Sequence, residues 1–394
     1  MPSRPFVLWI GALILHKSPL EVLEIARALP TIEFVMIGSP HDASLLDRLM
    51  KEKTPNLQYL GPVSDELKNA LVRSSSVGIT TSKYEGFGWI PFEFLTAGKP
   101  VIAYPLGVFH EIYGDLIIYA NDVNAFIRHL TEMQKNAFKV SVNRAEIAQL
   151  QKRFSFAPAA SRIAKLLGLT SLIIFTRDYP KSSDMIMGCD IVNWKLWKSI
   201  HDMGIDIQIY ANGTRYSTGS GLAFRTITVG RHLSFLRKAR TALNSSSWSA
   251  ADTVRSETEL KGIDGLVAKA LDLVLLILEP LSYAFCYMGG KDRICSHYIA
   301  ASGPPTILAG LIVKFLSGSR VVCIIHDTDF YDMTFCLNSS LPKLSFLMKI
   351  YYRIYTYCLR YVDGIITVSR ASMMGLSRIC PDSNKLVLLW GNAE

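Results

Sequence analysis

The first half of the chain alternates short β-branched runs with longer amphipathic segments. Six such runs are predicted to be strands: Phe6–Ile10, Glu33–Ile37, Leu57–Leu60, Val77–Thr80, Pro100–Ala103 and Leu116–Tyr119. This alternation is typical of a parallel sheet whose two faces are covered by helices. The first half is therefore predicted to be an α/β domain.

The second half repeats the alternation after residue 168. We expect a helix over Ile191–Asp202 and strands at Ser171–Thr176, Asp206–Tyr210, Ile294–Ile299, Arg320–Ile325 and Gly364–Val368. Residues 212–262 are rich in Ser, Thr and Arg with weak periodicity, which predicts an elaborated loop or a helical insertion. Because parallel α/β sheets bind ligands outside the carboxyl ends of their strands, a cleft between the two halves is the expected active site.

The start of the first helix is sharply predicted. Ser18 is expected to be the N-cap, Pro19 the first helical residue, and Glu21 the acidic partner that completes a capping box. Pro30 is expected to stop the helix.

Composition excludes several classes of protein. The 394 residues are 49% hydrophobic and 19% charged, which fits two or three globular domains and excludes a disordered chain. A net charge of +9 favours phosphorylated ligands, anionic membrane surfaces or nucleic acid. All 7 cysteines lie in the second half without metal-binding spacing, which indicates a reduced, cytoplasmic, zinc-free protein.

Two apolar segments need a separate interpretation. Phe6–Leu15 has the length of a signal-peptide core, but no cleavage site follows it, so a buried strand is favoured. Leu266–Met288 contains Lys269, Asp272 and Glu279. Because such charges are costly at bilayer depth, a buried or interfacial pair of helices is favoured over a membrane span.

The most informative stretch is residues 80–100. A strand ends near Thr80, a glycine-bearing turn follows, and Pro91 is predicted to open a helix whose N-terminal amides suit phosphate or sugar oxygens. Glu85 and Glu93 are separated by seven residues, and their carboxylates can accept hydrogen bonds from the hydroxyls of a sugar and a ribose. The alternative is that Glu93 only complements the helix dipole and Glu85 is a solvated turn residue.

This stretch resembles the E-x7-E signature of retaining GT-B glycosyltransferases, especially glycosyltransferase family 4 (group 1). The resemblance implies an α/β fold of the GT-B type, two Rossmann-like parallel-sheet domains facing across a cleft. Residues 1–167 would be the nucleotide-sugar donor-binding domain and residues 168–394 the acceptor-side domain. The implied reaction moves a sugar from a nucleotide diphosphate-sugar to a glycan or lipid-linked acceptor with retention, without a metal ion or a further cofactor.

The resemblance also implies roles for individual residues. Glu85 and His326 would be catalytic, the latter from a segment, Arg320–Asp327, that resembles a histidine-aspartate strand end. Glu93 would hold the ribose and Lys17 the diphosphate. The other implied donor-binding residues are Gly11, Gly86, Phe87, Gly88, Glu111 and Gly188.

One departure from the family pattern concerns charge. The residue after Gly11 is Ala12, where the family usually has an arginine. A leaving diphosphate favours two cations, so Arg177 or Lys181 is expected to supply the second. Asp327-Thr-Asp329 is formally a metal-binding D-x-D, but the E-x7-E context favours a metal-independent site.

The domains of the family stand here in reversed order, as in a circular permutant or in a joining of two partial sequences. The joined case leaves a second hypothesis open, a sugar-nucleotide-binding protein without turnover or inactive joined fragments of two glycosyltransferases. A nicotinamide dehydrogenase is disfavoured because neither half has G-x-G-x-x-G after its first strand.

A basic segment, Arg225–Arg240, fits either a solvated helix or contact with an anionic membrane surface, which would place the enzyme peripherally on the inner face of the membrane. No nucleic-acid-binding motif supports a nucleic-acid partner.

Overall fold

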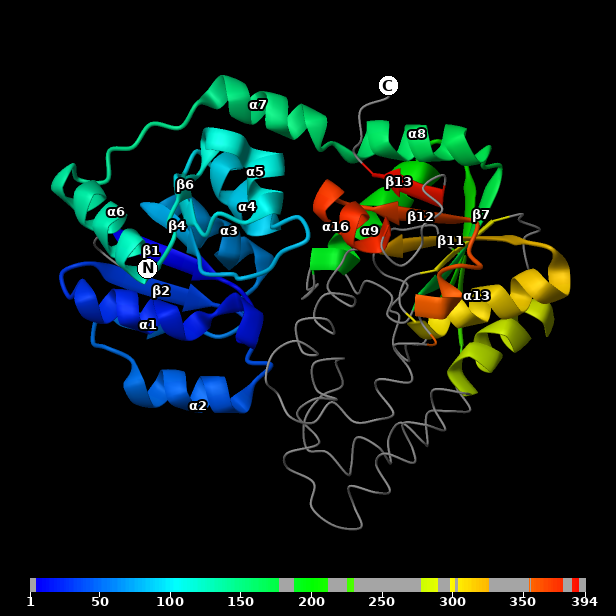
Figure 1. Ribbon diagram of the computed structural model, residues 1–394, viewed down its shortest axis with the longest axis horizontal. Coiled ribbons are helices and arrows are strands. Elements are labelled where there is room, and N and C mark those ends of the chain that lie inside the picture. The colour runs from blue at the N-terminus through cyan, green and yellow to red at the C-terminus, as the bar shows by residue number, and fades with distance from the viewer. Residues whose placement is uncertain are drawn as a thin grey trace, which may run out of the picture. The chain divides into compact units, whose positions relative to one another are not determined.

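The computed structural model describes residues 5–176, 188–211, 225–229, 278–289, 298–301, 304–325, 354, 356–377 and 385–389 (Figure 1). Contacts divide the chain into two compact units, Met1–Ser155 and Phe156–Glu394. Each unit contains one sheet in which every strand pair is parallel. The expectation of two parallel-sheet α/β domains is therefore confirmed.

The sheet of the first unit has six strands in the order β3-β2-β1-β4-β5-β6. All six predicted strands form, with ends that differ from the prediction by at most two residues: β1 Phe6–Ile10, β2 Glu33–Ile37, β3 Leu57–Tyr59, β4 Val77–Thr80, β5 Val101–Ala103 and β6 Ile118–Tyr119. Buried runs of this kind can be read from sequence because both faces of a parallel strand are apolar.

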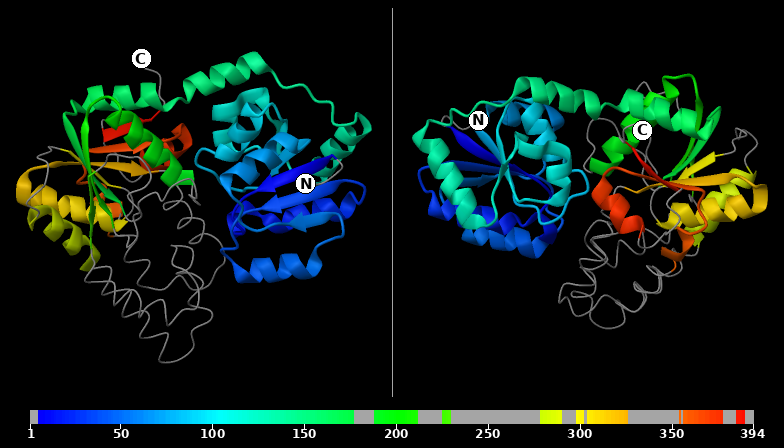
Figure 2. Two further views of the ribbon diagram at one scale, coloured as in Figure 1. Left: turned by 180° about the vertical axis from the view of Figure 1, so that it is seen from behind. Right: turned by 45° about the horizontal axis from the view of Figure 1, so that its top comes forward.

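Helices lie on both sides of this sheet (Figure 2). They are α1 Pro19–Ala28, α2 Ala43–Glu52, α3 Asp65–Ser74, α4 Trp89–Thr96, α5 Gly107–Tyr113, α6 Val123–Lys135 and α7 Arg144–Arg153. The core between α1, α6 and the sheet buries Trp9, Phe34 and Phe126. The buried Asn56 amide donates to the carbonyls of Ala26, Leu29 and Ile32, and so fixes the end of α1 against the start of β2.

The strand order reverses next to β1. The chain builds β2 and β3 on one side of β1 and then crosses to place β4, β5 and β6 on the other. The carboxyl ends of β1 and β4 therefore flank the point where the strand order reverses, which is the position where ligands bind in open α/β sheets. A 3₁₀ helix, Leu15–Lys17, follows β1 there, and the loop of residues 81–88 follows β4.

The predicted capping box at the start of α1 is wrong, although α1 does begin at Pro19. Ser18 is the N-cap residue but has a left-handed backbone (φ 45°, ψ 52°) and makes no side-chain cap bond. Its hydroxyl donates to the carbonyl of Leu15 at 3.5 Å instead. Glu21 does not reach back to Ser18 because its carboxylate binds Lys83 and Tyr104.

The second unit has a seven-stranded sheet in the order β13-β12-β11-β10-β7-β8-β9. Its strands are β7 Ser171–Thr176, β8 Asp206–Ala211, β9 Arg225–Thr228, β10 Tyr298–Ala301, β11 Arg320–Ile325, β12 Gly364–Thr367 and β13 Leu386–Leu388. Its helices are α8 Phe156–Leu167, α9 Gly188–His201, α13 Pro304–Ser317 and α16 Arg370–Ser377, together with residues 278–289. None of the helices in the described part of the chain is long and apolar enough to cross a membrane.

Three strands of this sheet, β9, β10 and β13, differ from the prediction, and β13, Leu386–Leu388, was not among the expected strands. β9 lies within the segment predicted to be a loop or helical insertion, and it forms because an edge strand needs backbone pairing on one side only, here with β8. β10 starts at Tyr298, four residues after the predicted start at Ile294, and residues 294–297 lie outside the described part.

Helix α8 packs with the second unit. It contacts α9, and the Arg162 guanidinium donates to the Leu388 carbonyl of the edge strand β13 at 3.0 Å. The contacts thus place the division of the chain between Ser155 and Phe156, whereas the sequence pattern placed it after residue 167.

The close approach of the loops after β1 and β2 yields a stability prediction. Gly38 has φ 143°, and a Cβ on it would lie 1.8 Å from the Gly11 carbonyl oxygen. We expect Gly38→Ala to lower the free energy of unfolding by about 3 kcal/mol, because the Gly11 backbone must move and the new residue is strained. Urea unfolding measures the loss. Gly107→Ala is the control, since no heavy atom lies within 4 Å of a Cβ there, and equal losses in both variants would contradict the prediction.

Candidate functional site

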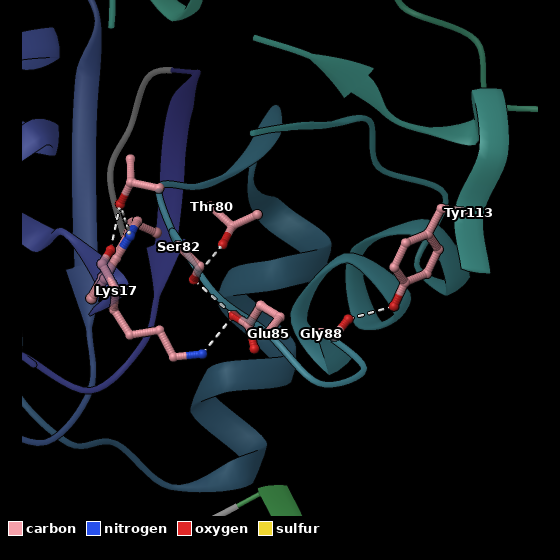
Figure 3. Close-up of polar contacts among 8 residues, drawn as sticks. Lys17, Thr80, Ser82, Glu85, Gly88 and Tyr113 are labelled. Carbon is pink, nitrogen blue, oxygen red and sulfur yellow. Dashed lines mark hydrogen bonds and ion pairs between the residues drawn. The ribbon is translucent and has the colours of Figure 1, made fainter. Parts of the chain in front are cut away.

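Lys17 and Glu85 form an ion pair where the loops after β1 and β4 meet (Figure 3). The Lys17 Nζ lies 2.5 Å from Glu85 Oε1, and the Ser82 hydroxyl donates to the same oxygen at 2.7 Å. Ser82 is in turn 3.1 Å from the Thr80 hydroxyl. The side chains of Lys17 and Glu85 are only 21% and 13% exposed. An ammonium ion and a carboxylate are thus held together at the edge of the sheet where the strand order reverses.

A buried hydroxyl fixes the backbone under this pair. The Thr81 hydroxyl faces the carbonyls of Lys17 at 2.7 Å and Ser18 at 3.1 Å, and accepts the Trp9 indole N–H at 3.0 Å. The Lys83 amide donates to the His16 carbonyl at 2.8 Å. These bonds join the two loops, so the position of Lys17 relative to Glu85 is set by backbone and core contacts.

A second charged cluster anchors the outer side of the same loop. Lys83 Nζ lies 2.8 Å from Glu21 Oε1 and 3.6 Å from the centre of the Tyr104 ring. The Tyr104 hydroxyl donates to Glu21 Oε2 at 2.6 Å. Burial, followed by this hydrogen bond and the charge of Glu21, raises the pKa of Tyr104 well above its ordinary value. The phenol therefore remains a donor to Glu21 at neutral pH.

The glycine turn before α4 is tightly enclosed. Gly88 is the N-cap of α4 with φ 77°, and a Cβ on it would lie 2.2 Å from the Phe109 ring. Its carbonyl accepts a hydrogen bond from the buried Tyr113 hydroxyl (Figure 3). Burial, and then the charge of Glu85, raises the pKa of Tyr113 well above the ordinary value, and Glu93 adds to this effect. Both carboxylates thus act on one phenol, which places them around the same turn.

Phe87 contributes its ring to the core. The ring is buried and lies 4.3 Å from that of Trp89 and 5.0 Å from that of Phe154, measured between centroids. A ligand at the turn would therefore meet the backbone of Phe87 rather than its side chain.

Glu93 lies in the second turn of α4, because the helix begins at Trp89 and not at the predicted Pro91. Its Oε1 is 3.0 Å from Lys68 Nζ on α3, and Lys68 is 3.4 Å from Asp65 Oδ1. Glu93 Oε2 is buried and has no hydrogen-bond partner among the described residues. Leaving a buried carboxylate oxygen without a hydrogen-bond donor costs free energy. A ligand hydroxyl that donates to this oxygen would recover that cost.

Lys68 is an ammonium ion at neutral pH. Burial alone would lower the pKa of Lys68, but the charge of Glu93, their hydrogen bond and the weaker effects of Asp65 outweigh burial and raise it. Its single positive charge therefore lies within ion-pair distance of both carboxylates.

Of the remaining predicted site residues, some lie in the first unit, one lies in the second, and others lie outside the described residues. Gly11 directly follows β1, and its amide donates to the Ile37 carbonyl at 3.0 Å. Gly86 is buried in the turn, and Glu111 is half-buried on α5, which follows β5. Gly188 is the first residue of α9 in the second unit. The predicted residues His326, Arg177, Lys181, Asp327 and Asp329 lie outside the described residues, as does most of the basic segment.

Several residues of the site were not found from the sequence. Lys68, Tyr113, Thr81 and Ser82 belong to no motif, and each is defined only by what it touches in the fold. Ser82 alone had a usable local feature, because it stands three residues before Glu85 in the same turn.

The buried His16 yields a pH prediction. Burial, then the charge of Lys17, lowers the pKa of His16 to about 4, although Glu85 acts in the opposite direction. The unfolded chain takes up this proton near pH 6.5 and the folded chain only near pH 4, so stability is lost as pH falls between these values. The loss assigned to His16 amounts to about 3 kcal/mol. Urea unfolding of the wild type and His16→Gln at pH 7 and pH 4 measures it; equal pH-dependent losses in the two proteins would contradict the assignment.

Comparison with known proteins finds similarity over the part of the chain that holds this site. The profile described as "Glycosyl transferases group 1" matches residues 2–151. A curated relative, the O-antigen chain mannosyltransferase B of Escherichia coli, is 27% identical over 162 residues, which are 38% of this chain and 42% of that protein. The chain thus matches less than half the length of this relative.

Solved structures with partial similarity include two proteins that each match less than half of this chain. Sucrose-phosphate synthase from Thermosynechococcus elongatus is 17% identical, with 43% of this chain and 46% of that chain covered and a TM-score of 0.38. HepE from Anabaena, solved with UDP and glucose, is 19% identical, with 42% and 49% covered and a TM-score of 0.36. Residues 2–151, the part of the chain that matches the glycosyl transferases group 1 profile, include both the Lys17–Glu85 and the Lys68–Glu93 pairs.

Proposed function

We propose that the chain transfers a sugar from a nucleotide diphosphate-sugar to a glycan or lipid-linked acceptor, with retention at the anomeric carbon and without a metal ion. The observation that carries the proposal is the pairing of Lys17 with Glu85 at the carboxyl ends of β1 and β4, inside the matched domain. The relative solved with UDP and glucose supports a nucleotide-sugar as the donor.

The charges and dipoles around the turn fit such a donor. The Lys17 ammonium has three hydrogen-bond donors, so it can face a diphosphate oxygen while it still holds Glu85. Glu85 would accept from the hydroxyls of the donor sugar, and the amides of residues 86–88 lie at the positive end of α4. In the reaction the bond from the anomeric carbon to the diphosphate oxygen breaks and a bond to the acceptor oxygen forms. The nucleoside diphosphate leaves and its freed oxygen takes up the proton of the acceptor hydroxyl.

Glu93 fits the nucleoside end of the donor. Its unpartnered Oε2 is a ready acceptor for a ribose hydroxyl, while Lys68 occupies Oε1. The two glutamates of the motif would therefore divide the donor between them.

The proposed role of the second half of the chain is to bind the acceptor. Residues 168–394 would bind the acceptor and supply His326, with the family's two domains in reversed order along the chain. A cytoplasmic enzyme, or one held at the inner membrane face, would meet such acceptors.

A binding protein without turnover is the second candidate, and Ala12 favours it. The position after Gly11 carries no charge, so the described residues give the diphosphate Lys17 but no arginine beside it. Mass spectrometry of reactions with a panel of nucleotide-sugars and acceptors decides between the two. Donor binding by calorimetry without hydrolysis or transfer would select the binding protein.

The division of roles between the two glutamates yields a prediction. We expect Glu93→Ala to weaken nucleoside diphosphate binding about tenfold or more, since a hydrogen bond to a charged group contributes about 1.5–3 kcal/mol. Glu85→Ala should instead lower turnover with little effect on nucleoside diphosphate binding. Calorimetry and initial-rate kinetics separate the two, with the exposed Glu132→Ala as the matched control. Equal effects of both variants on binding would refute the division.

A further inference from the structure

The Lys68–Glu93–Asp65 cluster joins α3 to α4, two helices that pack against each other. Lys68 and Asp65 lie on α3, and Glu93 lies on α4. None of the sequence motifs includes Lys68 or Asp65, and nothing in the reaction itself requires an ion pair at this place. The cluster therefore needs its own explanation.

The two oxygens of Glu93 are in different situations. Oε1 is bound by Lys68 at 3.0 Å, whereas Oε2 is buried without a hydrogen-bond partner among the described residues. A carboxylate with no fixed partner could rotate or swing toward water, and the Glu93 side chain, 30% exposed, has room to do so. The bond to Lys68 removes this freedom and leaves Oε2 at a defined point.

Lys68 is itself fixed. Its ammonium lies between Glu93 and Asp65, and Asp65 belongs to the first turn of the same helix, where Ser64 caps α3. Only 20% of the Lys68 side chain is exposed, so its geometry is restrained by packing as well as by charge. A hydrogen bond from a hydroxyl to a carboxylate is charge-assisted and stronger than one between neutral groups.

We propose that Lys68 is a positioning residue for nucleotide recognition: it holds one oxygen of Glu93 so that the other meets a ribose hydroxyl, and it thereby determines the preference for ribonucleotides over deoxyribonucleotides. This inference rests on the proposed function, in which Glu93 binds the nucleoside end of the donor. Asp65, 3.4 Å from the same ammonium, is a second ion-pair partner that holds Lys68 in place.

A purely structural role for the ion pair makes a different prediction. If Lys68 only tied α3 to α4, its loss would lower stability and weaken all nucleotides by the same factor. If Lys68 positions Glu93, its loss weakens the ribonucleotide but not the deoxy analogue, which lacks the hydroxyl that Glu93 would bind. The ratio of the two affinities then falls. The ratio is therefore the decisive measurement.

The experiment measures calorimetric affinities of the full chain for UDP and GDP and for their 2′-deoxy and 3′-deoxy forms. We expect wild-type protein to bind UDP or GDP about tenfold or more tightly than a deoxy form of the same nucleotide. Lys68→Met should reduce this ratio to within about twofold of unity, and Lys68→Arg should restore most of it. Lys51→Met, on an exposed part of α2, is the matched control and should leave the ratio unchanged.

Each outcome is decisive. A ratio in Lys68→Met equal to that of wild type overturns the inference while the proposed function stands. Wild-type protein that binds none of these nucleotides overturns the proposed function and the inference with it. If Lys68→Met does not unfold cooperatively, Lys68→Gln is measured instead, because the shorter glutamine side chain also fails to hold Glu93. The affinity ratio expected for Lys68→Gln is the one given for Lys68→Met. Glu93→Ala must lose the preference as well; a preference that survives in Glu93→Ala refutes the assignment of the ribose to Glu93.

Discussion

The buried hydrogen bonds that join the loops after β1 and β4 are the constraint on which the rest of the site depends, because they hold Lys17 beside Glu85. Lys17 follows β1 and Glu85 follows β4, and these strands pair with each other in the sheet. Along the chain, 66 residues lie between the last residue of β1, Ile10, and the first residue of β4, Val77. A charge pair that is mostly shielded from water gives net stabilisation only with good geometry and further hydrogen bonds. Ser82 and Thr80 supply those bonds on the acidic side. On the basic side Thr81 and Trp9 hold the Lys17 backbone, so the pair forms between groups that are already in place.

The left-handed backbone of Ser18 follows from the same constraint. A non-glycine residue at φ 45° is uncommon and strained, and such residues persist only when surrounding contacts hold them. Here the Ser18 carbonyl faces Thr81, and the turn points the preceding Lys17 toward Glu85. The local preference for a capping box is thereby overridden by a tertiary contact, and Glu21 is free to anchor Lys83 and Tyr104.

The sequence predicted what depends on local pattern. The strands of the first unit form buried apolar runs, and Pro19 marks the start of α1, so both could be identified without the fold. The E-x7-E spacing located Glu85 and Glu93 because both lie in one continuous strand-turn-helix segment. Lys68 could not be found in this way, since it is 25 residues from Glu93 and ordinary for an amphipathic helix until α3 packs on α4. β9 was missed for a similar reason, because four residues at a sheet edge carry little periodicity and are defined by their pairing with β8.

The hydrogen bond from Arg162 to Leu388 has a consequence for dividing the chain. β13 is an edge strand, and an edge offers unpaired carbonyl and amide groups to any other extended chain. Arg162 occupies one of these carbonyls from α8, the first helix of the second unit. A fragment that began after residue 167 would lack this cover and would expose the edge to self-association. One that began at Phe156 would retain it, so the cut that follows the contacts is the one that keeps this carbonyl of the β13 edge covered.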